Sequence, residues 1–280
     1  MHQSVLPRLL HCYTRNYGAI RQTVYALLWT LGTLAALALL PACSSSPDKP
    51  TPTDDPVYTL IFLDKTRSVD VNKAFVGQKY QEAVNEIIEQ NIRQKGDKLD
   101  VYFIHENTSK ARALNVTVRS EMEDVSAASQ TDREAAETEF NLLLTREKAQ
   151  IRQRVLQQLV AQNTGSSNRE TDIWASLPVI AKANESGATV KVYYLSDMIE
   201  SVKGTGRRDF QVTPPKDNAQ ADAWAKADAE QLKRHTIGTP DITMILPFEP
   251  NASVRENNPA VTQYWQTLFA ELGAGVVEEQ

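Results

Sequence analysis

The 280-residue chain contains very little cysteine, with Cys12 and Cys43 as its only two. Both lie near the N-terminus, so the rest of the chain has no disulfide and must be stabilised by its hydrophobic core. An excess of basic residues is also absent, because the formal net charge is −5. Nucleic-acid-binding domains usually carry a basic patch or stripe. This balance argues against general affinity for nucleic acids.

Several motifs of common enzyme classes are missing as well. The glycines at 204 and 206 do not follow a strand or open a helix, as a phosphate-binding loop requires. No serine nucleophile elbow occurs. His105 and His235 stand alone in the sequence, which is typical of structural or surface histidines. Neither a phosphate-binding loop nor a serine nucleophile is therefore indicated.

One long hydrophobic run is present, over residues 24–40, and a basic leader containing Arg8, Arg15 and Arg21 precedes it. Small residues follow the run and end at Cys43. A basic leader, an apolar core and a small-residue cleavage site predict a secretory signal over residues 1–42. The cysteine resembles that of the bacterial lipobox, which implies an acylated N-terminus at Cys43. An uncut signal anchor is the alternative, because a membrane span needs about 20 residues.

The segment that follows predicts how the protein is attached to the cell envelope. Residues 43–56 are rich in Ser, Pro, Asp and Thr, which is typical of an extended, disordered tether. The residue after the cysteine is Ser44 rather than Asp. By resemblance to bacterial lipoproteins, this implies an anchor in the outer membrane, with the domain facing the periplasm or the cell surface.

Beyond the tether, buried strands alternate with amphipathic helices. This order predicts an α/β domain over residues 57–274, with a doubly wound, mostly parallel sheet and a tail at 275–280. The short link after the second strand makes the third an antiparallel edge strand. We expect strands at 57–63, 99–105, 111–118, 189–196 and 242–246, and helices at 71–94, 131–162, 171–177, 218–235 and 259–272.

Oxygen-bearing side chains follow two of these strands. Asp64, Thr66 and Ser68 come directly after the first strand, and Asp197 follows the fourth. In the strand order 3-2-1-4-5 these two strands are neighbours, and ligands bind past their carboxyl ends. The loop carrying Thr171 can overhang the same place. Each of these polar residues could instead simply cap a helix.

Two carboxylates that converge without a cation repel each other, and one of them must become protonated. A divalent cation removes this conflict, and Mg²⁺ prefers oxygen ligands. The pattern Asp64-Lys65-Thr66-Arg67-Ser68, with Thr171 and Asp197, resembles the metal-ion-dependent adhesion site of the von Willebrand factor type A family. The likeness extends from residue 57 to about residue 273.

That resemblance implies a function and a role for each residue. Thr66, Ser68 and Thr171 would contact Mg²⁺, or Mn²⁺ or Ca²⁺, directly, while Asp64 and Asp197 would act largely through water. The metal would accept a carboxylate from a partner protein, in an adhesion, scaffold or assembly role without catalysis. We expect a monomer that binds no nucleic acid. The family usually has Ser where this chain has Thr66, so a family fold with a lost metal site is an alternative.

Two further hypotheses remain open at this point. Residues 62–66 are also similar to the aspartyl-phosphate motif of haloacid-dehalogenase-like phosphohydrolases, in which Asp64 would be the nucleophile. Those enzymes also need a downstream Lys and a later pair of acidic residues that binds Mg²⁺. Alternatively, the metal could be a structural element, with the long helix 131–162 as the docking surface.

Overall fold

A computed structural model describes residues 55–163 and 167–280. The predicted signal segment 1–42, Cys43 and the predicted tether up to residue 54 lie outside the described residues. Within the described part of the chain, no helix is both long enough and apolar enough to cross a membrane.

A six-stranded sheet forms the centre of the domain, in the order β3-β2-β1-β4-β5-β6. All neighbouring strands are parallel except β2 and β3, which are antiparallel. The predicted fold class and the antiparallel edge strand are therefore confirmed. The strands are β1 (Val57–Asp64), β2 (Lys98–Ile104), β3 (Arg112–Thr117), β4 (Thr189–Leu195), β5 (Asp241–Ile245) and β6 (Val276–Glu279).

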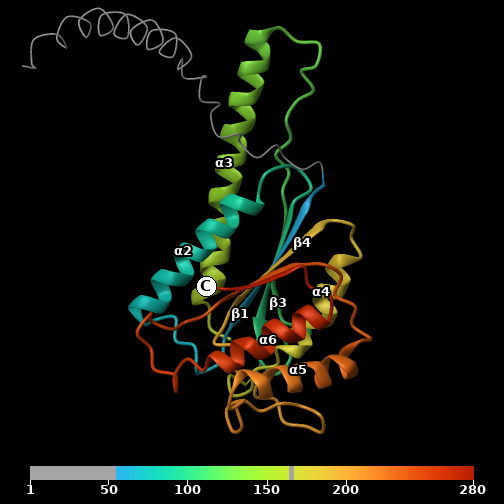
Figure 1. The fold of residues 1–280 in the computed structure, drawn as a ribbon. Helices are drawn as coiled ribbons and strands as arrows, with labels where there is room; N and C mark the ends of the chain where they lie inside the picture. The colour runs from blue at the N-terminus through green and yellow to red at the C-terminus, as the bar shows by residue number, and fades with distance from the viewer. Residues whose placement is uncertain (1–54, 164–166) are drawn as a thin grey trace, which may run out of the picture. The chain divides into compact units, whose positions relative to one another are not determined.

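Helices cover both faces of this sheet (Figure 1). Helices α2 and α3 pack on one face, and α4, α5 and α6 pack on the other. Because both faces are covered, β1 is buried along almost its whole length, as its unbroken apolar sequence predicts. The helices are α2 (Ala74–Asn91), α3 (Gln130–Val160), α4 (Leu177–Asn184), α5 (Asn218–Leu232) and α6 (Pro259–Glu271), with short 3₁₀ turns at Thr108–Lys110 and Trp174–Ser176.

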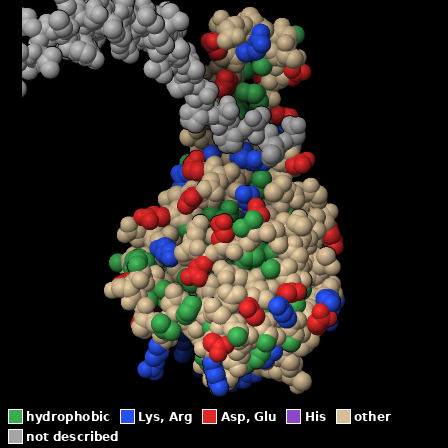
Figure 2. Space-filling model, viewed as in Figure 1, with side chains coloured by type: hydrophobic (Ala, Val, Ile, Leu, Met, Phe, Trp, Pro, Cys, Tyr) green, Lys and Arg blue, Asp and Glu red, His purple; other side chains and the backbone are tan. Residues whose placement is uncertain are grey.

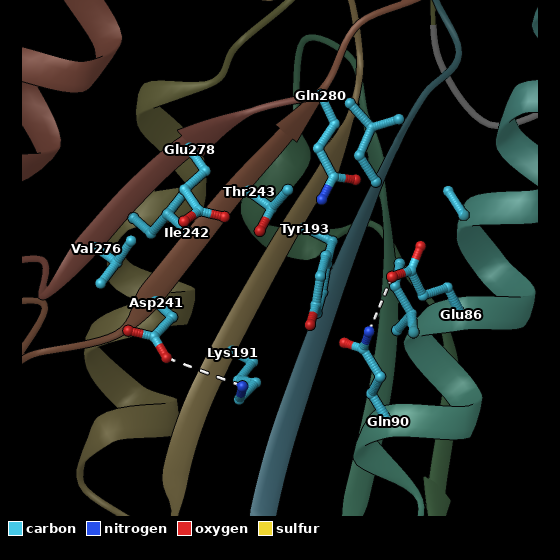
Figure 3. A pocket seen from close by; sticks show the side chains of 13 residues that line it. Glu86, Gln90, Lys191, Tyr193, Asp241, Ile242, Thr243, Val276, Glu278 and Gln280 are labelled. Carbon is cyan, nitrogen blue, oxygen red and sulfur yellow. Dashed lines mark hydrogen bonds and ion pairs between the residues drawn. The ribbon is translucent and has the colours of Figure 1, made fainter. Parts of the chain in front are cut away.

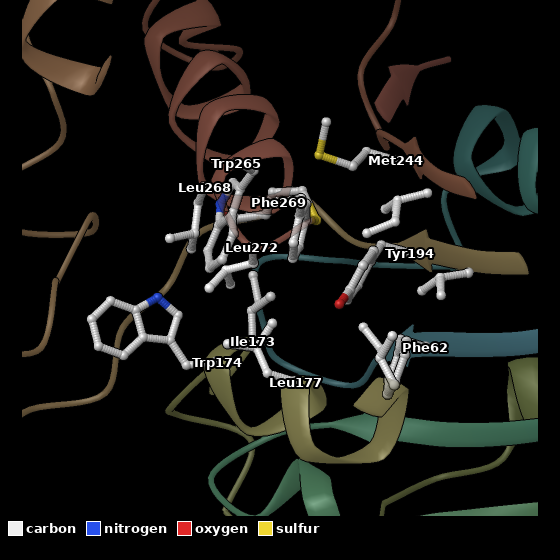
Figure 4. Packing of buried hydrophobic residues seen from close by; sticks show 14 of the residues in the cluster. Phe62, Ile173, Trp174, Leu177, Tyr194, Met244, Trp265, Leu268, Phe269 and Leu272 are labelled. Atoms are coloured by element: carbon white, nitrogen blue, oxygen red, sulfur yellow. The ribbon is translucent and has the colours of Figure 1, made fainter. Parts of the chain in front are cut away.

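Stacked aromatic rings fix α6 against the two central strands (Figure 4). Phe62 of β1 stacks on Tyr194 of β4 at 5.0 Å between ring centroids. Tyr194 stacks in turn on Phe269, at 5.6 Å, and Phe269 on Trp265, at 5.5 Å. Large aromatic side chains contribute most of the burial in such a core. This stack sets the position of the β4 end, where Asp197 follows.

Helix α3 extends well beyond the sheet (Figure 1). Only Ile151, Val155 and Leu159, all in its second half, are buried. Its first half and residues 118–129, which run beside it, form a projecting arm (Figure 1). Charged side chains of both signs and hydrophobic ones are mixed on this arm (Figure 2). The arm matches the expectation that the outer part of the long helix stands in solvent.

Two predicted elements differ from the structure. Residues 275–280 were expected to be a tail, but they contain β6, which pairs in parallel with β5. The helix expected at 171–177 instead begins as a 3₁₀ turn at Trp174 and continues as α4 to Asn184. Pro178 lies in the first turn of α4, where no backbone N–H is needed.

Candidate metal centre

The carboxylate of Asp64 lies at the carboxyl end of β1 and is buried. Its Oδ1 accepts hydrogen bonds from the Thr66 backbone N–H, at 2.8 Å, and from Thr66 Oγ1, at 2.6 Å. Its Oδ2 accepts one from Ser196 Oγ at 2.6 Å. Both oxygens are therefore held by neighbours, one of which comes from the next strand.

A chain of polar contacts leads from Asp64 to Asp197. Thr66 Oγ1 lies 3.1 Å from Ser68 Oγ, and Ser68 hydrogen-bonds the carboxylate of Asp197. The Asp197 Oδ1 atom also accepts from the Ile199 N–H at 3.0 Å. The structure thus brings together four of the predicted site residues from the ends of β1 and β4.

The electrostatics of these two carboxyl groups reflect their closeness. Burial raises the pKa of Asp64 above its ordinary value, against the hydrogen bonds from Ser196 and Thr66. Burial also raises the pKa of Asp197, and the negative charge of Asp64 raises it further. Two buried acids that repel each other in this way are more stable beside a cation.

The fifth predicted residue, Thr171, lies in a loop held against the end of β4. Its N–H donates to Ser201 Oγ at 2.8 Å, and its carbonyl accepts from the Ser201 N–H at 3.0 Å. Three residues after β1, the Arg67 N–H donates to the carbonyl of Asn168 at 3.2 Å, so the same loop also touches the segment after β1. Thr171 is therefore positioned by both strand ends.

The hydroxyl of Thr171 is a buried polar atom that has no hydrogen-bond partner among the described residues. Such an atom costs about 1–3 kcal/mol when left unsatisfied. A cation ligated by its oxygen would satisfy it. Together, Asp64, Thr66, Ser68, Thr171 and Asp197 form what we call the hydroxyl–carboxylate cluster. Its all-oxygen composition fits a hard cation such as Mg²⁺.

The cluster is poor in charged ligands. In residues 55–163 and 167–280, no group of three or more His, Cys, Asp or Glu side chains is arranged to hold a metal ion. The cluster offers two carboxylates and three hydroxyls instead. A divalent cation ligated directly by the three neutral hydroxyls would keep much of its positive charge, and this would favour an anionic ligand from outside the chain.

The loop that carries Asp197 is strained and tightly held. Met198 has φ +59°, a left-handed conformation that is uncommon for a residue with a side chain. Its N–H donates to Ser196 Oγ at 3.0 Å, and its carbonyl accepts from the Trp265 indole at 2.8 Å. Strained backbone of this kind is often found at functional sites.

Sequence reasoning missed Ser196 and Tyr80. Ser196 could have been found, because it directly precedes Asp197 at the end of a strand next to β1. Tyr80 lies on α2, and burial together with the charges of Asp64 and Asp197 raises its pKa. Its hydroxyl is buried without a hydrogen-bond partner among the described residues. Nothing in the local sequence of α2 distinguishes Tyr80 from an ordinary core residue.

A cleft of about 820 Å³ opens beside the cluster. Ser68 and Asp197 form part of its lining, and Phe75, Ile199 and Phe248 supply apolar surface. A ligand group that reached the cluster would therefore pass along a partly hydrophobic wall. Clefts that combine apolar walls with a few polar groups are typical of binding sites.

A separate pocket of about 350 Å³ lies on the sheet face beside α2 (Figure 3). Lys191, Tyr193 and Asp241 line it, and the ion pair between Lys191 and Asp241 spans 3.9 Å (Figure 3). None of the predicted site residues belongs to its lining. This pocket and the hydroxyl–carboxylate cluster are therefore distinct features.

Lys65 lies between Asp64 and Thr66 in sequence, but its ammonium group binds a different element. Its Nζ donates to the carbonyls of Gln158, Leu159 and Ala161 at 2.7, 2.7 and 2.9 Å. These carbonyls end α3, where a helix has no partners of its own for them and favours positive charge. Lys65 thus joins the candidate site to the long helix.

Comparisons with known proteins identify no family. No family model matches the chain, and no curated protein matches it. Solved structures that resemble it include proximal thread matrix protein 1 from the mussel byssus (TM-score 0.37, 14% identity). Others are a von Willebrand factor type A protein from Catenulispora acidiphila (0.36, 13%) and a mutant of the PilB minor pilin from Streptococcus sanguinis (0.38, 8%).

These likenesses are distant. The alignments cover 81%, 78% and 82% of this chain, but only 44%, 41% and 58% of the respective structures. The chain therefore spans less than two thirds of the length of each. They carry no argument about the fold or the function.

Proposed function

We propose that the domain binds Mg²⁺ at the hydroxyl–carboxylate cluster and thereby captures a carboxylate of a partner protein. Thr66, Ser68 and Thr171 would offer their hydroxyl oxygens to the cation, and Asp64 and Asp197 would balance its charge, largely through water. The cation would supply the coordination position that a partner carboxylate fills. The observation that carries this proposal is the buried, unpartnered hydroxyl of Thr171, in a loop that hydrogen-bonds to the segment carrying Asp64, Thr66 and Ser68.

The adjoining cleft supports a protein as the partner. Its apolar wall, formed in part by Phe75 and Phe248, would pack against side chains that flank the bound carboxylate. Burial of apolar area contributes about 25 cal/mol per Å², so the flanking contacts would add to the affinity and the specificity. We further propose that an acylated Cys43 holds the domain at the outer membrane, where it would act as an adhesion, scaffold or assembly factor.

We propose no catalytic role for Asp64. Both oxygens of Asp64 accept hydrogen bonds, from Thr66 and Ser196, and these bonds withdraw electron density that a nucleophilic carboxylate would use. Lys65, which follows it, is engaged with the end of α3. We therefore expect no Mg²⁺-dependent hydrolysis of p-nitrophenyl phosphate.

The proposal is tested by titrating Mg²⁺ into the metal-free protein and its Thr171→Val variant. At ten times the dissociation constant, Mg²⁺ should stabilise the wild-type domain by about 1.4 kcal/mol. For a domain of this size, this raises Tm by about 3–6 °C. Thr171→Val keeps the shape of the side chain and removes the hydroxyl, so in EDTA it should unfold at the wild-type temperature or slightly above it.

The partner is tested with the same two proteins in a pull-down from a bacterial envelope extract. Wild-type protein should capture a partner in Mg²⁺ and lose it in EDTA, and Thr171→Val should capture little in either buffer. Capture that is equal in Mg²⁺ and EDTA would overturn the proposal. An equal rise in Tm for both proteins would show that the Thr171 hydroxyl does not bind the cation.

A further inference from the structure

A groove separates the edge strand β3 from helix α3, away from the hydroxyl–carboxylate cluster. It measures about 1050 Å³. Residues 115–119 form one wall and residues of α3 from Leu143 to Arg154 form the other. The groove lies near the amino end of β1. Gly96 lines the groove, and its neighbour Asp97 accepts a hydrogen bond at 2.8 Å from the N–H of Val57, the first residue of β1. The candidate metal centre lies at the opposite end of β1.

The groove is basic, although the whole chain is acidic. Lys95, Arg119, Arg146 and Arg154 all line it, against one acid, Glu147. Glu147 is already used, since it accepts hydrogen bonds from the Arg119 N–H, at 3.0 Å, and from the Ser120 N–H, at 2.9 Å.

Three of the four cations are available to a ligand. Within residues 55–163 and 167–280, no carboxylate forms an ion pair with the side chain of Arg119, Arg146 or Arg154, and all three are exposed. Only Lys95 is paired, with Glu121 at 2.5 Å. Arg146 and Arg154 are about two turns apart on α3, and both line the groove. The groove thus has a row of positive charge along one wall.

The opposite wall has free backbone groups. Strand β3 is the last in the sheet and pairs only with β2. Next to it, Val118 bonds inward, donating to the Asp97 carbonyl at 2.8 Å and accepting from the Gly96 N–H at 3.1 Å. In an antiparallel pair, inward and outward groups alternate along the strand. The N–H and C=O of Thr117 and Asn115 therefore point outward, where another strand could pair with them.

We propose that this groove binds an extended acidic peptide, which adds to the sheet as a strand beside β3. Its backbone would pair with the outward groups of Asn115 and Thr117. Acidic side chains at alternate positions would face α3 and bind Arg146 and Arg154. Main-chain pairing at a sheet edge gives affinity and alternate side chains give specificity in this mode of recognition. The proposal is independent of the metal centre.

The test uses a fluorescein-labelled octapeptide in which glutamate alternates with threonine, and a matched peptide with lysine for every glutamate. Fluorescence anisotropy should show binding of the glutamate peptide alone, equally in Mg²⁺ and EDTA. The double variant Arg146→Glu, Arg154→Glu should weaken it by about tenfold or more, which is about 1.4 kcal/mol. Arg133→Glu, an exposed arginine on the same helix outside the groove, is the charge-reversal control and should change binding less than about twofold.

Strand addition is tested separately, with two N-methylated forms of the peptide. One is methylated at every glutamate and the other at every threonine, which blocks the N–H groups of opposite strand edges. Only one of the two should lose binding. Equal behaviour of the two forms would overturn strand pairing. Binding to vesicles containing anionic phospholipid, lost in the double arginine variant, together with no binding of the peptide, would overturn the proposal in favour of a membrane surface.

Discussion

The buried carboxyl group of Glu200 is the most perturbed acid outside the hydroxyl–carboxylate cluster. Its Oε2 accepts from the Ile173 N–H at 2.8 Å, and its Oε1 bonds to Arg207. Arg207 also bonds Asp172 at 2.5 Å and lies over the ring of Trp174 at 4.7 Å. Burial raises the pKa of Glu200 to about 8, although the charge of Arg207 acts in the opposite direction. This group of side chains fixes the loop that carries Thr171.

The raised pKa of Glu200 predicts a pH dependence of stability. Between its ordinary value of 4.5 and about 8, the folded state keeps a proton that the unfolded state loses. The free energy of unfolding should therefore fall as pH rises through this window, by up to about 1.4 kcal/mol per pH unit from this group. Glu200→Gln removes this titration.

Urea unfolding of both proteins in EDTA, from pH 5 to about pH 8, measures the difference. Asp64 and Asp197 titrate in both proteins, so the difference between the two slopes isolates Glu200. Parallel slopes would mean that Glu200 remains charged in the folded state, held by Arg207.

At the same scale, sequence reasoning located some side chains and missed others. Asp64, Thr66, Ser68 and Asp197 were placed together because parallel strands end at one edge of a sheet, and the structure brings these four into contact. Their metal-binding role stays a prediction. The cluster of Glu200, Arg207 and Asp172 could not be foreseen, because it depends on how an irregular loop folds back over the 3₁₀ turn.

At the scale of elements, helix α3 depends on a residue far from it in sequence. Its last carbonyls bond to Lys65, which follows β1 directly, and no basic residue lies in its own last turn. Burial lowers the pKa of Lys65 to about 8, so the structure tolerates a costly placement of this amine. The contact fixes the end of α3 against the sheet.

Lys65→Met should destabilise the domain by about 1–3 kcal/mol, because it leaves half-buried helix carbonyls without a donor. The loss should appear as a lower urea midpoint and as faster amide exchange over residues 155–161. Lys110→Met, at an exposed position, should leave both unchanged. If the Lys65 and Lys110 variants behaved alike, solvent would be satisfying the end of α3.

Element boundaries were the least predictable feature. Strand and helix types followed from apolar periodicity, and each of the predicted strands is present within a few residues. Strand β6 was missed because Val276-Val277-Glu278-Glu279 is short and half acidic, and it becomes a strand only through pairing with β5. Local propensity does not contain that information.

At the scale of the whole molecule, β6 closes one side of the sheet. Besides its pairing with β5, the Gln280 N–H donates to the Met244 carbonyl at 2.8 Å, and the Gln280 carbonyl accepts from the Leu246 N–H at 3.0 Å. Removing residues 276–280 should therefore lower the free energy of unfolding by about 2–5 kcal/mol, from several lost hydrogen bonds. Urea unfolding measures this, and a wild-type midpoint would show that these residues contribute nothing to the fold.

The contact between Lys65 and α3 has a mechanical consequence. With 31 residues, α3 is a rod of about 46 Å whose outer half is unsupported by the sheet. A force applied to that outer half is transmitted through the helix to its C-terminal end, which hydrogen-bonds Lys65, the residue between Asp64 and Thr66. A force on the arm therefore acts on the segment that supplies two side chains of the hydroxyl–carboxylate cluster.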